Sequence, residues 1–368
     1  MSTGSSAGND PEKGAVMPDN IVGAVPGEDK KQDFRNVCLR LGVMLIIIFV
    51  SRGVENILYS LEIGWFSSFD PNASYLLETA MSFLFLYIIP LGCTIALLKP
   101  PGMCGKVYKK PKFFGSAMGM FPALYGVAIM TNMLTMLCSK LFEQTDLYKS
   151  FNTVNSLKPD NMFCAIVLLV QLVVIAPLFE EFWFRGIVLE SLRPYGNGFA
   201  IFVSALMFGL THANLNQFFY AFVLGIGLGY IAVSTESIVT TTIMHAMFNG
   251  ISGIMLLLIT FDDVGDYLMS LSAGMEGEMT PMVTVYLVFL FVVFMLMLVG
   301  VFMAIAKFRK IKRYKVPKTW DVPAGKRWGI LLSRFTMIIG LIFAVDTMGM
   351  QYITRGIFRL LTMAFQLE

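Results

Sequence analysis

The sequence contains eight apolar runs, most of them about 20 residues long, and this feature restricts the fold more than any other. An α-helix of that length crosses the hydrocarbon core of a bilayer. The runs are continuous and do not alternate in polarity, which argues against a membrane β-barrel. Charged residues make up only 14% of the chain, about half of the proportion found in soluble domains. We therefore predict an all-α fold, a polytopic bundle of transmembrane helices.

The predicted spans differ in length and polarity. The fifth run is short, and the eighth is almost purely apolar, so we expect the eighth to be the most exposed to lipid. A further stretch, residues 329–350, is predicted as a ninth span, with a helix in the membrane interface as the alternative. The eight runs are residues 37–58, 75–98, 113–141, 162–189, 199–211, 217–233, 238–259 and 282–306.

The charged residues outside the runs predict the orientation of the chain. Lys and Arg gather before the first run, between the second and third, and after the eighth, whereas residues 62–78 and 262–278 contain none. Basic loops tend to stay on the cytoplasmic side. We therefore expect a multi-pass protein of a bacterial cell membrane with a cytoplasmic N-terminus. Such a distribution indicates membrane orientation and not nucleic-acid binding.

The chain divides into three predicted parts. Residues 1–33 are polar and rich in Gly, Ser and Pro, so we expect a disordered tail. Residues 34–306 form the predicted transmembrane core, within which residues 160–260 carry the motifs described below. Residues 307–368 begin as a basic cytoplasmic segment and contain the candidate ninth span.

Three charged side chains stand near the end of the fourth run: Glu180, Glu181 and Arg185. Charged groups within a membrane are costly and therefore point to a functional site. Glu181 and Arg185 are four residues apart, so they lie on one helix face and are expected to pair. Glu180 points about 100° away around the helix and lacks such a local partner. We interpret Glu181 and Arg185 as supporting residues and Glu180 as available for chemistry.

The chain has only two histidines, and each has a notable neighbour on its own helix face. Phe208 precedes His212 by four residues, and Asn249 follows His245 by four residues. Each motif alone has an ordinary structural explanation, and Phe208 is expected to be a packing residue in any case. Together with Glu180, however, the two imidazoles and the carboxamide form a set that can line one cavity.

This set contains the groups needed to hydrolyse an amide. Glu180 can take a proton from water, and His212 can orient that water. His245 and Asn249 can donate hydrogen bonds to the oxyanion of the tetrahedral intermediate. Glu180, His212 and His245 also equal the ligand count of a catalytic zinc site, so zinc or another divalent metal is the alternative. We favour a reaction without a cofactor, because the chain lacks the His-Glu-x-x-His helix of metalloproteases.

In order and spacing, the three motifs resemble the signature of the CPBP family of intramembrane proteases. That family includes type II CAAX prenyl endopeptidases and the bacteriocin-processing and self-immunity proteins of the Abi group. The resemblance implies an eight-helix core and an endopeptidase acting on a peptide or protein, lipidated or not. It also implies a cavity within the membrane lined by Glu180, His212, His245 and Asn249 and supported by Glu181 and Arg185. The motifs are Pro177-x-x-Glu180-Glu181-x-x-x-Arg185-Gly186, Phe208-x-x-x-His212 and His245-x-x-x-Asn249.

Two other functions are the alternatives to an endopeptidase. A membrane transporter or ion relay would use the same polar groups, but it usually has a second, repeat-related set of broken helices. This sequence shows no such second set. A catalytically silent immunity or scaffold protein would tolerate the loss of Glu180. We predict an intramembrane endopeptidase that uses a glutamate- and histidine-activated water.

Overall fold

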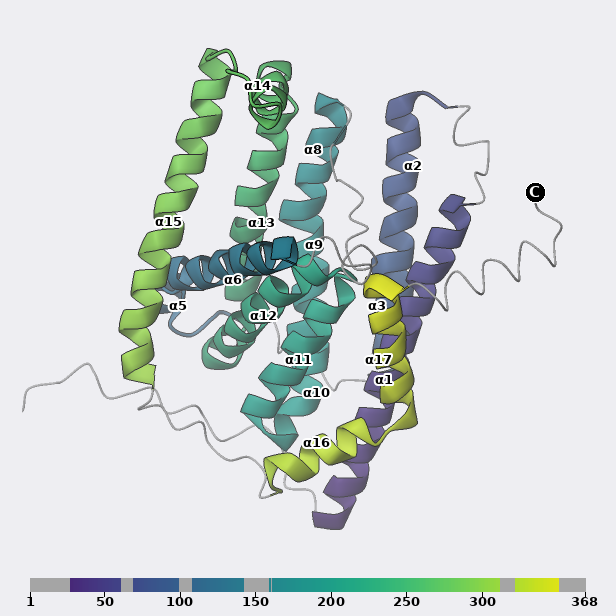
Figure 1. Ribbon diagram of the computed structural model, residues 1–368. Coiled ribbons are helices and arrows are strands. Elements are labelled where there is room, and N and C mark those ends of the chain that lie inside the picture. The colour runs from purple at the N-terminus through teal and green to yellow at the C-terminus, as the bar shows by residue number, and fades with distance from the viewer. Residues whose placement is uncertain are drawn as a thin grey trace, which may run out of the picture.

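The computed structural model describes residues 27–60, 69–98, 108–141, 159, 161–311 and 322–350, which form helices without any strand (Figure 1). The predicted all-α bundle is therefore confirmed. The first part contains α1 (Gly27–Ser60), α2 (Pro71–Phe83), the π-helical turn η2 (Leu84–Ile88), α3 (Ile89–Leu98), α5 (Phe114–Met118) and α6 (Phe121–Leu141). The motif-bearing part contains α8 (Met162–Val170), η3 (Gln171–Ile175), α9 (Ala176–Glu180), η4 (Glu181–Leu189), α10 (Glu190–Leu192), η5 (Arg193–Tyr195), α11 (Asn197–Thr211), α12 (Leu215–Thr235) and α13 (Val239–Ile259). The last part contains α14 (Asp262–Ser272), α15 (Pro281–Ile311), α16 (Ala324–Leu332), α17 (Phe335–Val345) and η6 (Asp346–Met350).

Seven helical segments of the described chain are long and apolar enough to cross a membrane, or eight if the bent pair α16–α17 counts as one span. They overlap all the predicted runs except the fifth, which forms the 15-residue helix α11. At 1.5 Å per residue α11 is about 22 Å long, shorter than a hydrocarbon core of about 30 Å. Segment 281–306 has the smallest buried share of the seven, 11%, so the prediction that the eighth run is the most lipid-exposed is confirmed.

Two of the membrane helices widen into π-helical turns just before a proline. Proline has no N–H, so it cannot complete the helical hydrogen bond to an earlier carbonyl. In the α2–α3 helix, Pro90 leaves the carbonyl of Phe85 without a helical partner, and Ser51 Oγ of α1 donates to that carbonyl at 2.6 Å. Pro177 follows η3 in the same way. Both irregular turns are thus direct consequences of the sequence.

Helices α11 and α12 form a hairpin whose turn lies inside the bundle. Figure 1 shows this turn at about mid-height, between α9 and α1. The Asn214 side chain accepts a hydrogen bond from the amide of Gln217 at 2.8 Å and so begins α12. A Cβ added at Gly225 of α12 would lie 3.0 Å from the Cα of Ala205 in α11. Gly225 therefore permits close contact between α11 and α12, and this contact brings the end of α11 to the bundle centre.

Two charged residues of the first run, Arg52 and Glu55, face the protein. Arg52 donates a hydrogen bond to the carbonyl of Thr211, at the end of α11. Glu55 is buried and accepts a hydrogen bond from Ser82 Oγ at 2.6 Å. Because these polar groups have partners inside the bundle, α1 packs in the core along much of its length.

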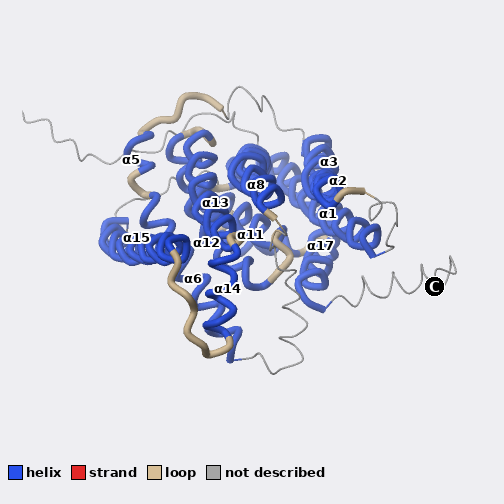
Figure 2. The backbone as a smooth tube through the Cα atoms, turned by 90° about the horizontal axis from the view of Figure 1, so that it is seen from above, coloured by secondary structure: helices blue, strands red, loops and turns tan. Residues whose placement is uncertain are grey.

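Two predicted boundaries at the ends of the chain need correction. Helix α1 begins at Gly27, so residues 27–33 are helical and do not belong to a disordered tail; residues 1–26 lie outside the described chain. Residues 329–350 do not form one continuous helix, because α16 and α17 meet at an angle of 76°. Helix α17 packs along α1 (Figures 1 and 2), where Gly340 permits close contact with Leu45. Neither alternative, a single span or a single interfacial helix, describes the whole stretch.

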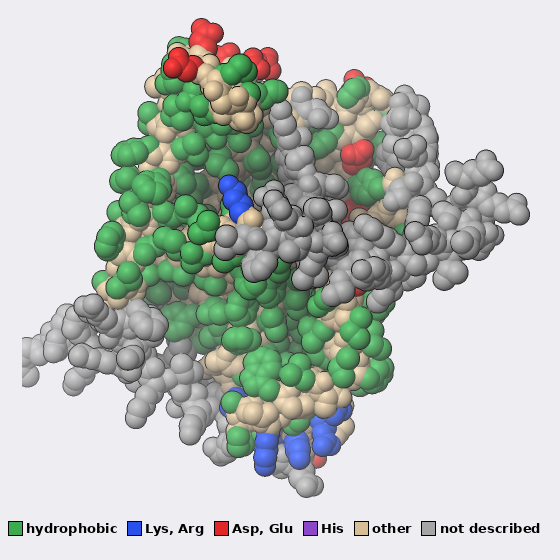
Figure 3. Space-filling model, viewed as in Figure 1, with side chains coloured by type: hydrophobic (Ala, Val, Ile, Leu, Met, Phe, Trp, Pro, Cys, Tyr) green, Lys and Arg blue, Asp and Glu red, His purple; other side chains and the backbone are tan. Residues whose placement is uncertain are grey.

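The surface separates charge in the way the loop composition predicts. Figure 3 shows acidic side chains at the α14 end, basic side chains at the α16 end, and a hydrophobic surface between them. Helix α14 carries three exposed aspartates: Asp262, Asp263 and Asp266. The described structure is that of an integral membrane protein.

Candidate active site

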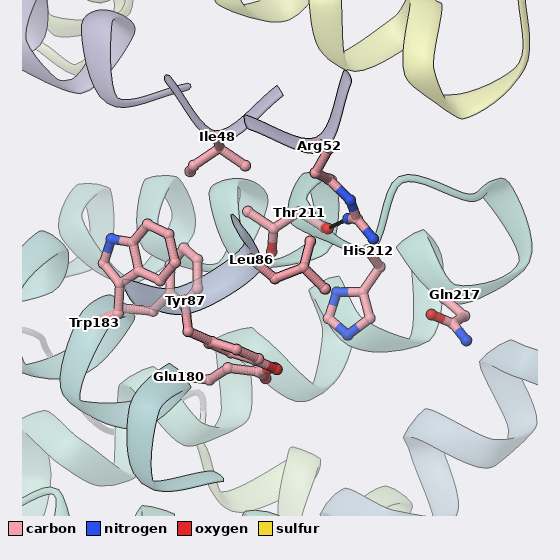
Figure 4. A pocket seen from close by; sticks show the side chains of 10 residues that line it. Ile48, Arg52, Leu86, Tyr87, Glu180, Trp183, Thr211, His212 and Gln217 are labelled. Atoms are coloured by element: carbon pink, nitrogen blue, oxygen red, sulfur yellow. Dashed lines mark hydrogen bonds between the residues drawn. The ribbon is translucent and has the colours of Figure 1, made fainter. Parts of the chain in front are cut away.

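A cavity of about 140 Å³ lies where α1, η2, the α9–η4 junction and the α11–α12 turn meet (Figure 4). Two residues of the predicted set, Glu180 and His212, line it. Arg52 and Tyr87 line it as well. The remaining lining residues are Ile48, Leu86, Trp183, Phe184, Thr211 and Gln217. The cavity therefore combines a carboxylate, an imidazole, a guanidinium and a phenol within mainly apolar walls.

The two carboxylate oxygens of Glu180 have different partners. Oε1 accepts a hydrogen bond from Tyr87 Oη at 2.7 Å. Oε2 lies 3.7 Å from Nε2 of His245, which is close to hydrogen-bonding distance. The Glu180 side chain is 16% exposed, whereas that of His245 is 3% exposed. One oxygen is thus anchored, and the other stays beside an imidazole at the edge of the cavity.

Glu181, Arg185 and His245 form a buried network next to the cavity. The predicted pair is present, since Arg185 Nη1 lies 2.8 Å from Glu181 Oε1, and both side chains are 0% exposed. The same oxygen accepts a hydrogen bond from His245 Nδ1 at 2.9 Å. Because a carboxylate only accepts hydrogen bonds, Nδ1 must carry the proton. Glu181 therefore sets the orientation of His245 and leaves Nε2 facing Glu180.

His212 is oriented by its own helix. Its Nδ1 lies 2.9 Å from the carbonyl of Phe208, a contact that requires the proton on Nδ1. Nε2 is then an acceptor, and Figure 4 shows the ring among the cavity residues. The ring of Phe208 stands edge-on to both imidazoles, with centroids 5.0 Å from His212 and 5.7 Å from His245. The guanidinium of Arg185 lies 4.4 Å from the centroid of the same ring, so Phe208 packs the network together.

Asn249 lies beside η3, the irregular turn that precedes α9, and is not among the cavity-lining residues. Its Nδ2 donates to the carbonyl of Leu172 at 2.9 Å. That carbonyl has no helical partner, because the amide of Ala176 bonds to Gln171 and Pro177 has no N–H. Asn249 therefore satisfies a carbonyl freed by Pro177, as Ser51 does in α2–α3.

The alternative metal site does not assemble in this conformation. Across the described ranges, no group of three His, Cys, Asp or Glu side chains is placed so that it could hold a metal ion. Each imidazole uses Nδ1 in a hydrogen bond, to Phe208 for His212 and to Glu181 for His245, which leaves Nε2 as the nitrogen that could bind a metal. Because Glu180, His212 and His245 do not form a group of three ligands here, we derive no step through a metal.

The sequence motifs do not include Arg52 and Tyr87 of the cavity. Arg52 interrupts the apolar first run, and an arginine in a membrane span indicates function by itself. Tyr87 stands in an apolar run without any charged neighbour, and Pro90 was the one sign of an irregular turn there. Both come from helices that precede the motif-bearing region.

The comparisons with known proteins agree with the motifs. Residues 162–251 match the family model described as "Type II CAAX prenyl endopeptidase Rce1-like". The other two comparisons returned no match among curated proteins and none among solved structures. The matched residues run from α8 to α13 and include every motif residue named above. Over these residues the chain is similar to Rce1-like type II CAAX prenyl endopeptidases, in agreement with the resemblance of its motifs to the CPBP family.

Proposed function

We propose that this chain is an intramembrane endopeptidase that hydrolyses a peptide bond with a water molecule held between Glu180 and His212. The observation that supports this most is their convergence on one small cavity from separate helices. The cavity lies among side chains of the bundle, where electrostatic interactions are stronger than in water.

Glu180 acts as the general base in this proposal. It takes a proton from the water as the water oxygen attacks the carbonyl carbon of the substrate. Nε2 of His212, free to accept because Nδ1 is bonded to Phe208, receives the other water proton as a hydrogen bond. The proton held by Glu180 then passes to the amide nitrogen, the C–N bond breaks, and a carboxylic acid and an amine are released.

The negative charge that develops on the carbonyl oxygen needs hydrogen-bond donors. His245 donates from Nε2 as an imidazolium, held in place by Glu181. Asn249 is the second proposed donor. Its carboxamide has two N–H groups, and the one bonded to Leu172 leaves the other available. Glu181 and Arg185 support the site by fixing His245.

We propose a peptide or protein substrate that reaches the cavity from the bilayer, with no cofactor required. The family match makes peptides with a prenylated cysteine three residues before the C-terminus the first class to test, beside the same peptides without lipid. We also propose that the N-terminus is cytoplasmic, which the opposite charges of the α14 and α16 ends support (Figure 3). In a cysteine-free background, Lys109→Cys should be labelled from the cytoplasm and Glu276→Cys from outside. Labelling of both from one side would refute this orientation.

The test of function compares Glu180→Gln with the wild type on purified protein and a peptide library. We expect the substitution to abolish cleavage while thermal stability stays near that of the wild type, because it removes a base but little volume. Glu190→Gln is the matched control. Glu190 lies on the same helix, is 40% exposed and pairs only with Arg193 in the described structure, so its loss should leave cleavage unchanged.

Each other outcome points to a different function. Equal cleavage by the wild type and Glu180→Gln would refute the proposed role of Glu180. Absence of cleavage, together with ion flux in proteoliposomes that depends on Glu180, would favour an ion relay. Absence of both, with biological activity retained by Glu180→Gln, would favour a silent immunity protein.

A further inference from the structure

The hydroxyl of Tyr87 makes a short hydrogen bond to Glu180 in the centre of the bundle. The distance of 2.7 Å from Oη to Oε1 is typical of a donor on a charged acceptor. Tyr87 belongs to η2, outside residues 162–251 that match the family model. Neither the motifs nor the match gives this residue a role.

The surroundings of Tyr87 fix the direction of its hydroxyl. Pro90 widens the helix at η2, and Ser51 holds this turn against α1 through the carbonyl of Phe85. The ring is packed by Phe179, with centroids 5.8 Å apart, and by Phe83 at 5.6 Å. A side chain supported by an irregular turn and two aromatic rings has little freedom to move away from Glu180.

We propose that Tyr87 is a positioning residue for the reaction described above, on which this inference rests. It anchors Oε1 of Glu180, so that Oε2 stays beside His245.

The other charged groups around Glu180 show why such an anchor is needed. Arg52 lines the same cavity and, among the described residues, has no carboxylate within the 4.0 Å of an ion pair. Its guanidinium is tied to the carbonyl of Thr211 (Figure 4). A carboxylate released from Tyr87 can rotate toward Arg52 and form an ion pair that removes the base from the water. The hydroxyl therefore keeps Glu180 between His212 and His245.

The kinetic test uses Tyr87→Phe, which removes one oxygen and preserves the ring. Loss of a hydrogen bond to a charged group corresponds to roughly 10- to 100-fold, and we expect kcat to fall by that factor. KM should change little, because Tyr87 acts on Glu180 and not on the substrate. Tyr125→Phe is the matched control, since Tyr125 is 1% exposed and packs in a separate cluster. Its kcat should equal that of the wild type.

A second measurement does not depend on activity. A hydrophobic carbodiimide labels protonated carboxyl groups in membranes, and peptide mass spectrometry locates the label. At neutral pH we expect Glu180 to be labelled at least several-fold more slowly in Tyr87→Phe than in the wild type or in Tyr125→Phe. An ion pair with Arg52 favours the charged form of a carboxyl group, with which the reagent does not react.

The outcomes separate this inference from the proposed function. If the wild type cleaves peptides and Tyr87→Phe has the same kcat, the inference is overturned while the peptidase stands. If neither the wild type nor any variant cleaves a peptide, the proposed peptidase function is refuted. The labelling experiment alone then tests whether Tyr87 positions Glu180. Equal or faster labelling of Glu180 in Tyr87→Phe than in the wild type overturns the positioning role, whereas slower labelling supports it. Thermal unfolding of each variant verifies that it is folded.

Discussion

Arg185 is the residue whose loss we expect to destabilise the bundle most. The substitution Arg185→Met keeps an unbranched side chain of moderate length but removes the charge. It eliminates the 2.8 Å ion pair to Glu181, a 3.4 Å hydrogen bond to the carbonyl of Gly225 and the face contact with Phe208. Glu181 then stays fully buried with His245 as its one strong donor.

The size of the effect follows from the burial of the pair. Breaking a buried ion pair by removing one partner costs about 3–5 kcal/mol, and Oε2 of Glu181 already has no hydrogen-bond partner in the described structure. The double variant Glu181→Gln/Arg185→Met removes both charges and retains an amide oxygen that accepts from His245. We expect it to cost only about 1–2 kcal/mol, because no uncompensated charge is left behind. Arg185→Met alone should therefore cost about 2–3 kcal/mol more than the double variant.

The assay is the free energy of unfolding, measured by titration with sodium dodecyl sulfate in mixed micelles and followed by circular dichroism. Arg193→Met is the matched control, because Arg193 pairs with Glu190 at 2.8 Å while both remain partly exposed. It should cost less than about 1 kcal/mol. Additive effects of Glu181→Gln and Arg185→Met, or an Arg185→Met cost as small as that of the control, would refute the reasoning.

Two further predictions concern the edge of the bundle and the widened turns. Hydrogen bonds from Lys109 and Lys112 hold the pKa of Glu236 in the folded protein below its ordinary value of 4.5. The contribution of Glu236 to stability is therefore complete above pH 4.5 and is lost as the pH falls through the pKa of the folded state. Glu236→Gln should therefore lower the free energy of unfolding by about 0.5–1 kcal/mol at pH 7, and a difference that persists at pH 3 would contradict this account. Asn249→Ala and Ser51→Ala should each cost about 1–3 kcal/mol, because each leaves a carbonyl unpaired next to a proline. If Asn249 is also an oxyanion donor, Asn249→Ala alone should lower kcat, so equal kcat in both variants would reduce Asn249 to a structural role.

The sequence by itself determined the class of protein, the position of most helices and one pair of the site. Apolar runs and charged loops are properties of local composition, and local composition decides which segments cross the bilayer and on which side the loops lie. The pair of Glu181 and Arg185 follows from i,i+4 spacing on a single helix. Two features of the fold do not follow from any local sequence pattern. These are the angle between α16 and α17 and the turn after α11 in the middle of the bundle.

Only the tertiary structure decided which groups surround Glu180. Tyr87 stands 93 residues before it, and Arg52 contacts a carbonyl 159 residues away. Asn249, which spacing paired with His245, turns to a carbonyl freed by Pro177 on another helix. Apolar periodicity shows which face of a helix is buried but not which neighbour it meets, because any of several apolar helices can cover the same face. The partners of the carboxylate therefore depend on helix rotation and on two proline-widened turns, and those are settled by packing across the whole bundle.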